Sequence, residues 1–367
     1  MALYDWRAMD HAARRERLAS RLPELKMDAL LITRLPNVRY LTGFTGSNGQ
    51  LLLTASEARF FTDGRYEEQA RHEVPDVARD IRPHTAIPKA FADAARDAGA
   101  RRMGFEADGV TYRTYEQLAE RGGPELVPVQ GEVERLRQAK DPEEIRLIER
   151  AQELTDEAFE RVLAKLVEGV TEQEAALELE ETMRHGGAER MAFDPIVGFG
   201  ENAAEPHHHP TDRPLRRGDV VKMDFGCVVD GYHSDMTRTV ALGDPDPRLV
   251  EIHEVVRRAQ EAGVAAVRAG AGSGDVDESA RSIIREAGYG ERFGHSLGHG
   301  VGLEIHEGPA VRTGSEEDLP EGAVVTVEPG IYIPELGGVR IEDMVEVTAD
   351  GCRPLPRSTR ELVVIQP

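Results

Sequence analysis

The feature that most constrains this 367-residue chain is a strand–turn–strand pattern that occurs twice and carries two acidic residues each time. The first copy spans residues 220–239 and the second spans residues 324–345. When the copies are aligned on their first acids, the matching pairs are Gly218 with Gly322, Val220 with Val324, Val221 with Val325, Asp224 with Glu328, and Gly226 with Gly330. This repeat predicts a domain of two related halves, with the acids between them.

The alternation of side chains along a strand places the two acids of the first copy on one face. Asp224 and Asp235 are directly opposed if the turn centres on residues 229 and 230. They are diagonal neighbours if it centres on residues 230 and 231. Both registers leave the two carboxylates facing the same side, so the pattern alone leaves the choice between them open.

Glu328 and Glu342 share a face by the same argument, so four carboxylates are expected to face one space. Their mutual repulsion would raise their pKa values and keep some of them protonated. Two divalent cations would balance the four negative charges. An acid on a surface strand is the alternative for any one of them. That alternative fits the set poorly, because Val, Ile, Met and Phe flank these acids and an unpaired carboxylate is costly to bury.

Composition excludes several classes of protein. The net charge of −22 argues against a nucleic-acid partner and against binding to an anionic membrane. Two cysteines, Cys227 and Cys352, are too few for a disulfide scaffold. The segment from Met1 to Leu22 is charged throughout, and no run approaches the roughly 20 apolar residues of a membrane span. We therefore expect a cytoplasmic protein without a signal peptide.

The first part of the chain alternates strand-like and helix-like segments, which predicts an α/β domain over residues 1–131. The expected strands are 29–33, 50–54, 60–62 and 103–105, and the expected helices are 10–25, 66–73 and 88–98.

A second domain is predicted over residues 141–367. Asp141, Pro142 and Glu144 form a capping box with proline at the first helical position, and Gly169 closes that helix. Further helices are expected from a second capping box at 171–174, over 247–269, and from an N-cap at Asp275. The order helix–helix–hairpin occurs twice, in agreement with the repeated acidic strands.

From about Asp141 to the C-terminus, the chain resembles the pita-bread metallopeptidases, which include methionine aminopeptidase, prolidase, aminopeptidase P and creatinase. The matching stretches are Pro206-His207, 224–226, 234–238, 295–302, His306-Glu307, 328–330 and 340–343. Residues 37–44 and 62–66 are similar to the N-terminal domain of prolidase and aminopeptidase P, which methionine aminopeptidases generally lack. The resemblance implies a creatinase-like α/β domain followed by a pseudo-twofold pita-bread catalytic domain of the Xaa-Pro branch.

The resemblance also implies two metal ions and five ligands. One ion would be bound by Asp235, His299, Glu328 and Glu342, and the other by Asp224, Asp235 and Glu342. Oxygen-rich ligation with one imidazole favours Mn²⁺, with Co²⁺ or Zn²⁺ as alternatives. Such a pair of ions can ionise a water molecule near neutral pH to attack the carbonyl before the proline nitrogen. Glu328 would then move the proton toward the leaving nitrogen.

Three further residues match catalytic positions of the family. His207 and His306 correspond to histidines that hydrogen-bond the substrate or the oxyanion. Arg340 could orient a bridging acid or one of these histidines. The alternatives are a satisfied core histidine for His306 and a surface ion pair for Arg340.

Four other residues have weaker links to the site. His295 precedes the proposed ligand His299 by four residues in a glycine-rich stretch, and Tyr332 lies close enough along the chain to reach the acids. A solvated loop that binds stray metal is the alternative for the histidine run that begins at His207, and it stays open for His208 and His209.

The resemblance implies an Xaa-Pro aminopeptidase that acts, as a homodimer, on peptides with proline at the second position. An Xaa-Pro dipeptidase (prolidase) is the main alternative. Metal-free creatinase and a metal-free peptide-binding pseudoenzyme are disfavoured by the complete ligand set. Prolidases often carry an arginine four residues after the histidine that matches His306. Here that residue is Ala310, with Arg312 two residues further on, and this departure favours aminopeptidase P.

Overall fold

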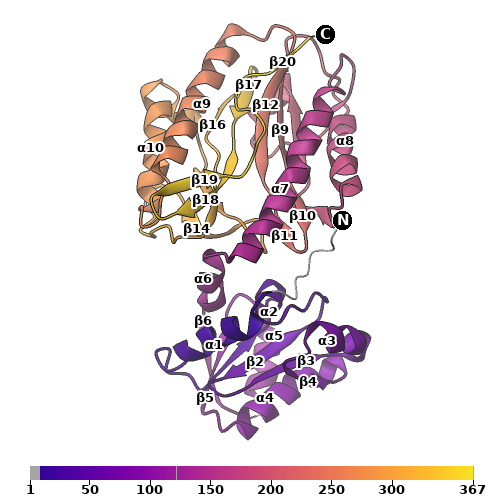
Figure 1. Cartoon of the computed structure of the whole chain (residues 1–367), viewed down its shortest axis with the longest axis vertical. Coiled ribbons are helices and arrows are strands. Elements are labelled where there is room, and N and C mark those ends of the chain that lie inside the picture. The colour runs from indigo at the N-terminus through magenta and orange to yellow at the C-terminus, as the bar shows by residue number, and fades with distance from the viewer. Residues whose placement is uncertain (1–8, 121, 367) are drawn as a thin grey trace. The chain divides into compact units, whose positions relative to one another are not determined.

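The computed structural model of this protein describes residues 9–120 and 122–366, which form two compact units divided between Arg137 and Gln138 (Figure 1). The expectation about the N-terminal segment falls partly on residues 1–8, outside the described residues. The predicted domain limits, 1–131 and 141–367, stay a prediction. None of the helices formed by the described residues combines the length and the apolar character needed to span a bilayer.

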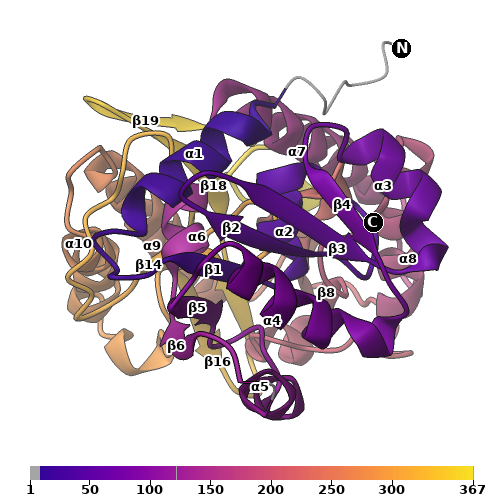
Figure 2. The same cartoon turned by 90° about the horizontal axis from the view of Figure 1, so that it is seen from below.

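The first unit is an α/β domain around a six-stranded mixed sheet with the order β4-β3-β2-β1-β5-β6, which can be followed in Figure 2. Its strands are β1 Ala29–Ile32, β2 Gln50–Thr54, β3 Ala58–Thr62, β4 Ala78–Ile81, β5 Arg102–Glu106 and β6 Glu125–Val129. Its helices are α1 His11–Arg21, α2 Leu35–Thr42, α3 Glu67–Glu73, α4 Ile87–Asp97, α5 Tyr112–Ala119 and α6 Glu132–Gln138, with short 3-10 turns at Gly64–Tyr66 and His84–Ala86. The predicted α/β class is confirmed.

Alternation along the strands of this sheet separates two apolar faces. Ala29 and Leu31 of β1 pack with Phe61 of β3 and with Phe91 of α4, and all four side chains are buried. The intervening residue Leu30 is also buried, on the opposite face of the sheet. A central strand buried on both faces reads as a continuous apolar run, as β1 does.

The second unit contains the two halves that the repeat predicts. The first half comprises α7 Pro142–Leu163, α8 Glu172–His185, β7 Arg190–Met191, β8 Ile196–Phe199, the 3-10 helix η4 Gly200–Ala204, β9 Val220–Phe225, β10 Cys227–Val229, β11 Tyr232–His233 and β12 Met236–Leu242. The second half comprises α9 Pro247–Ala266, α10 Ser273–Glu286, the 3-10 helix Gly290–Arg292, β13 Gly298–Gly300, β14 Glu307–Val311, β15 Val324–Val327, β16 Gly330–Ile333, β17 Gly337–Arg340, β18 Asp343–Thr348 and β19 Gly351–Pro354. The short β20, Val364–Ile365, returns to the sheet of the first half.

Corresponding backbone contacts confirm the pseudo-twofold arrangement. The aligned glycines Gly218 and Gly322 both have positive φ, 89° and 80°, and their amides donate to Leu242 and Val347 at 2.7 and 2.9 Å. Figure 1 shows the strands between the helix pair α7–α8 and the helix pair α9–α10. Each helix pair closes its own apolar core.

The capping boxes begin the helices of the first half as predicted. Asp141 accepts from the amides of Glu143 and Glu144, each at 3.0 Å, and Thr171 caps α8 in the same way. Several predicted helix limits were wrong. α1 ends at Arg21 rather than at residue 25, and α9 ends at Ala266 rather than at residue 269. α7 ends at Leu163 rather than near Gly169, because the chain turns there and buries Leu166.

Another wrong limit is the start of α10, which begins at Ser273 rather than after Asp275. Its N-cap is Gly272, which forms a bridge with Asp318. That bridge fixes Gly272 in an extended conformation, so the helix begins with the next residue.

Candidate active site

The strand registers decide how each pair of acids is arranged. In the first half, Asp224 pairs with Thr237, so Asp235 is the diagonal neighbour of Asp224. The turn centres on Asp230 and Gly231, whose φ angles of 45° and 78° suit a two-residue hairpin turn. The structure therefore selects the second of the two registers that the sequence allows.

In the second half, the acids are directly opposed. Val327 pairs with Asp343 in one ladder and Gly330 pairs with Arg340 in the next. Glu328 and Glu342 lie between these two ladders and in register with both. Their carboxylates therefore face the same side from adjacent strands.

Two glycines allow backbone segments to approach the acids and His299 closely. A Cβ atom at Gly226 would lie 1.9 Å from the carbonyl oxygen of Ser234, next to Asp235. A Cβ atom at Gly298 would lie 1.9 Å from the carbonyl oxygen of Thr326. Any larger residue would push these strands apart, because such contacts fall far inside van der Waals distance.

The nine residues predicted as metal ligands or catalytic residues line one cavity of about 550 Å³ in the second unit. They are His207, Asp224, Asp235, His295, His299, His306, Glu328, Arg340 and Glu342. The same cavity is lined by residues that the sequence did not single out for the site, among them Phe193, Ile196 and Ile305. These apolar side chains had no distinguishing local pattern.

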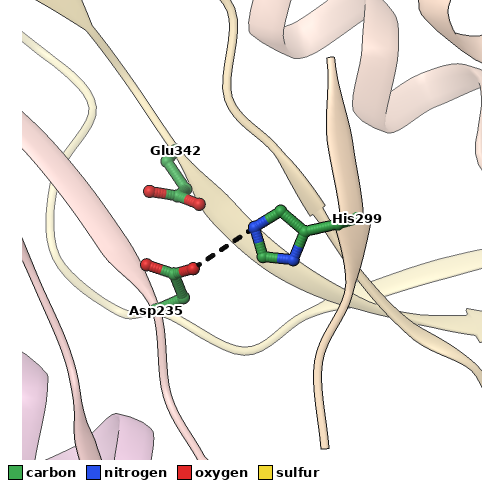
Figure 3. A group of neighbouring side chains, drawn as sticks. All are labelled: Asp235, His299 and Glu342. Carbon is green, nitrogen blue, oxygen red and sulfur yellow. Dashed lines mark ion pairs between the residues drawn. The ribbon is translucent and has the colours of Figure 1, made fainter. Parts of the chain in front are cut away.

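Asp235, His299 and Glu342 point toward one another (Figure 3), and one possible ligand atom from each lies within 4.8 Å of the others. The Nε2 atom of His299 lies 3.6 Å from Asp235 and 3.4 Å from Glu328. Its Nδ1 atom lies 3.0 Å from the carbonyl oxygen of Gly300. A proton on Nδ1 would satisfy that carbonyl and leave the Nε2 lone pair directed at the acids, as in metal-binding histidines.

The electrostatics of the cluster favour a bound cation. Burial raises the pKa of Asp235 and of Glu342 well above the ordinary values, and repulsion from the neighbouring acids, Asp224 and Glu328 among them, adds to this rise. Burial also raises the pKa of Glu328 to about 8 and lowers the pKa of His299 to about 4. Among the described residues, no hydrogen-bond donor reaches the buried Oδ1 atom of Asp224. Crowded carboxylates, a neutral imidazole and an unpaired buried oxygen are what divalent ions stabilise, so these residues fit them.

Arg340 lies inside this cluster, so a surface ion pair was the wrong alternative for it. Its side chain is 2 % exposed and forms a close ion pair with Asp224. It also donates to the hydroxyls of Thr237 at 3.0 Å and Tyr332 at 2.8 Å. Tyr332 in turn lies 2.9 Å from Nε2 of His295, so one network connects these residues to the acids.

Two threonines that the sequence analysis missed hold the glutamates of the second half. Thr237 donates to Glu342 at 2.7 Å, and Thr326 donates to Glu328 at 3.2 Å. The Thr326 hydroxyl also accepts from the amide of His299 at 3.1 Å. Each threonine is two residues from an acid on its own strand, so the parity of the strand was a signal that could have found them.

The histidine run is divided between the cavity and the interior. His207 and His209 line the cavity, whereas His208 is only 6 % exposed and contacts Glu172 and Glu205. The solvated-loop alternative is therefore wrong for His208. His306 packs its ring edge-on against His299, with ring centres 4.4 Å apart.

Comparison with known proteins places the chain in a family. A model of metallopeptidase family M24 matches residues 146–349, and a model of the creatinase/prolidase N-terminal domain matches residues 14–139. An uncharacterized peptidase of Bacillus subtilis is 44% identical over 95% of this chain and 99% of its own length. The Xaa-Pro dipeptidase of Pyrococcus horikoshii is 38% identical over 92% of this chain and 95% of its own.

Solved structures agree with these relatives. The Xaa-Pro dipeptidase from Bacillus anthracis superposes with a TM-score of 0.94 at 40% identity, covering 97% of this chain and 100% of its own. The X-Pro aminopeptidase from Thermotoga maritima superposes with a TM-score of 0.87 at 37% identity, covering 96% of this chain and 99% of its own. The protein therefore belongs to metallopeptidase family M24, in the Xaa-Pro branch that combines the pita-bread catalytic domain with a creatinase/prolidase N-terminal domain.

Proposed function

We propose that the protein is an Xaa-Pro dipeptidase, which hydrolyses the bond before proline in two-residue substrates. The observation that carries this proposal is Arg312, whose side chain lines the same cavity as the acids. In the described part of the chain, no carboxylate forms an ion pair with Arg312, so its charge is free to bind the carboxylate at the end of a dipeptide. The names of the relatives from Bacillus anthracis and Pyrococcus horikoshii also favour this reaction over the aminopeptidase that Ala310 suggested.

The five proposed metal ligands are Asp224, Asp235, His299, Glu328 and Glu342, and Asp235 and Glu342 would bridge. When bound there, divalent ions would supply an activated water molecule and polarise the substrate carbonyl. Mn²⁺ is the ion we favour, because oxygen atoms dominate the donor set.

The side chains around the acids would perform three tasks. Glu328 would hold the proton taken from the nucleophile and pass it to the leaving proline nitrogen. His207 and His306 would donate hydrogen bonds to the carbonyl oxygen as negative charge develops on it. Arg340 would hold the Asp224 carboxylate in place through their close ion pair.

The apolar wall of the cavity suits a proline ring. Phe193, Ile196 and Ile305 line it next to the histidines. A ring that fills apolar surface gains about 25 cal/mol for each Å² removed from water. Secondary amides would lack that contact, so we expect them to be poor substrates.

The test compares kcat/KM for Xaa-Pro, for its amide Xaa-Pro-NH2 and for Xaa-Pro-Yaa, all with the Mn²⁺-loaded protein. We expect the dipeptide to be preferred, and Arg312→Ala to reduce its kcat/KM by roughly 10- to 100-fold, the range for a lost charged hydrogen bond. The amide, which lacks the terminal carboxylate, should react equally with both proteins. Arg292→Ala, which removes a surface arginine outside this cavity, is the matched control.

An Xaa-Pro aminopeptidase is the second candidate, and Ala310 is the observation that favours it. Because alanine carries no charge, the residue at position 310 would not block the C-terminal part of a longer peptide. If the tripeptide is cleaved at least as well as the dipeptide and Arg312→Ala has no effect, this candidate is correct. We also propose, from the resemblance, that the protein is a cytoplasmic homodimer.

A further inference from the structure

The segment that carries His207 folds around a single buried carboxylate. Glu172, the first residue of α8, is fully buried. Its Oε1 atom accepts from the amide of Phe199 at 2.8 Å and from Asn202 at 2.9 Å. Its Oε2 atom accepts from the amide and hydroxyl of Thr211 at 2.9 and 2.6 Å, and from His208 at 2.9 Å. One side chain therefore holds both ends of the segment 199–211.

His208 connects this carboxylate to a second one. Its Nε2 atom lies 2.9 Å from Glu172, and its Nδ1 atom lies 2.9 Å from Glu205. The imidazole is buried between them, while its neighbours His207 and His209 line the cavity. The chain therefore points one histidine away from the site as an anchor and two toward it.

The hydrogen bonds to Glu172 favour its ionised form. Burial alone would raise the pKa of this carboxyl, but the hydrogen bonds from Thr211 and His208 outweigh burial and lower it. Hydrogen bonds to an ionised acceptor are roughly twice as strong as neutral ones. Removing the carboxylate would also leave several buried donors unsatisfied, which is more destabilising than the loss of an exposed contact.

The same segment is held from the cavity side by Arg340. Both terminal nitrogens of Arg340 lie 3.3 Å from the carbonyl oxygen of Pro206, the residue before His207. Lys222 contacts the carbonyl oxygens of Glu205 and Pro206. His207 is therefore flanked by a cationic anchor on one side and the Glu172–His208 anchor on the other.

We propose that Glu172 and His208 are positioning residues, which hold the His207 side chain in the place from which it donates to the substrate carbonyl. This inference rests on the proposed function, in which His207 is that donor.

The second half has a related carboxylate one turn further into α10. There, the buried Asp277 accepts from the amide of Leu297 at 3.0 Å and from the hydroxyl of Thr313 at 2.8 Å, the two ends of the segment that carries His306. Its ion-pair partner is Arg281, so a histidine anchor next to a cavity histidine is a feature of the first half among the described residues.

A double-mutant cycle tests the proposal with the full-length, Mn²⁺-loaded protein. We expect His208→Ala to lower kcat by roughly 10- to 100-fold, since a displacement of about 1 Å can have an effect of that size. KM and the number of bound metal ions should stay unchanged. If His208 acts through His207, the same substitution should have no further effect on kcat in a His207→Ala background. The conservative change His208→Asn, which can keep one of the two hydrogen bonds, should recover part of the rate.

Hydrogen–deuterium exchange supplies a readout that does not depend on turnover. In Glu172→Gln, the amides of Phe199 and Thr211 should exchange faster than in the wild type. The matched control is Asp156→Asn, a buried carboxylate that instead accepts from the amides of Arg357 and Ser358, each at 3.0 Å. It should lower the melting temperature without changing kcat or the exchange of residues 199–211.

Three results would overturn the proposal. They are additive effects of the two histidine substitutions on kcat, a loss of metal in His208→Ala, and unchanged exchange in Glu172→Gln. A wild-type protein that binds metal and hydrolyses no Xaa-Pro peptide would instead overturn the proposed function, and with it the catalytic part of this inference. That result is seen before any variant is made, so the two failures are distinguishable.

Discussion

The two halves of the second unit share one backbone plan but place their acids differently. In β9–β12, the short side chains Asp224 and Asp235 are diagonal neighbours across a two-residue turn. In β15–β18, the longer side chains Glu328 and Glu342 are directly opposed. Opposed positions on adjacent strands are about 4.5–5.5 Å apart at Cβ, and diagonal ones are further apart. The second hairpin carries glutamates and the first carries the shorter aspartates. The four carboxylates therefore meet in one cavity although the two hairpins are not exact copies of each other.

The neighbouring strands of the halves differ in chemistry. β13, beside β15, supplies His299, whereas β8, beside β9, supplies Ile196 to the same cavity. At these matching strands, the second half therefore contributes the one imidazole of the proposed ligand set, and the first half contributes an apolar side chain. The two halves share a backbone plan, but the side chains at corresponding positions differ in chemistry.

The largest expected effect comes from removing one bridging acid from each half. Asp235→Ala and Glu342→Ala should each lose both metal ions and at least about 10³-fold in kcat/KM, more than the loss of one oxyanion donor. Elemental analysis and chelator treatment measure this, with activity of the wild type restored best by Mn²⁺ or Co²⁺. Retention of two ions by either variant would show that the halves do not share the metals as proposed.

The next largest loss of activity is expected when either proposed hydrogen-bond donor is removed, His207 in the first half or His306 in the second. Each histidine-to-alanine variant should keep its metal and lose on the order of 10²–10³-fold in kcat. Steady-state kinetics together with metal analysis make the measurement. A near wild-type rate for His306→Ala with full metal occupancy would make it a core histidine that packs on His299.

A smaller effect is expected at the threonines that hold the glutamates. Thr237→Val and Thr326→Val remove one hydroxyl each with little change in shape. Metal affinity or activity should fall by roughly 10- to 100-fold, as for other residues that orient ligands. Thr237→Val should have the larger effect, because the Thr237 hydroxyl contacts two charged side chains, Glu342 and Arg340. The Thr326 hydroxyl contacts one, Glu328, and otherwise a backbone amide. Calorimetric titration with Mn²⁺ measures the metal affinity of both variants. Negligible changes in both would mean that the strands alone orient the glutamates.

The smallest effect on activity is expected at His253 of α9, which is 4 % exposed. Burial lowers the pKa of His253 to about 4, below its value of about 6.5 in an unfolded chain. The unfolded chain therefore binds the proton more tightly, so the stability due to the neutral ring is complete above pH 6.5 and is lost as the pH falls toward 4.

His253→Gln removes this titration. Between pH 7 and pH 5, its free energy of unfolding should fall by about 1–2 kcal/mol less than that of the wild type. Urea unfolding at both pH values measures the difference, and kcat at pH 7 is the control that should not change. Equal pH dependence in the two proteins would show that His253 is protonated without penalty in the folded state.

Much of the fold and of the site could be predicted from the sequence, because the signals are local. The capping boxes at Asp141 and Thr171 fix where two helices begin through contacts within one turn. The doubled acidic pattern predicted the two halves, since a period of two residues assigns each acid to a face. The family motifs identified nine site residues, and all nine line one cavity.

The alternation of side chains did not decide the register of the first hairpin. Two registers that differ by two residues leave Asp224 and Asp235 on the same face, so the alternation cannot distinguish them. The turn geometry at Asp230 and Gly231 does so. The burial of Arg340 and the anchor from Glu172 to His208 were also beyond the sequence. Their partners lie 116 and 36 residues away along the chain, and no local pattern records a contact that forms only when distant strands and helices pack together.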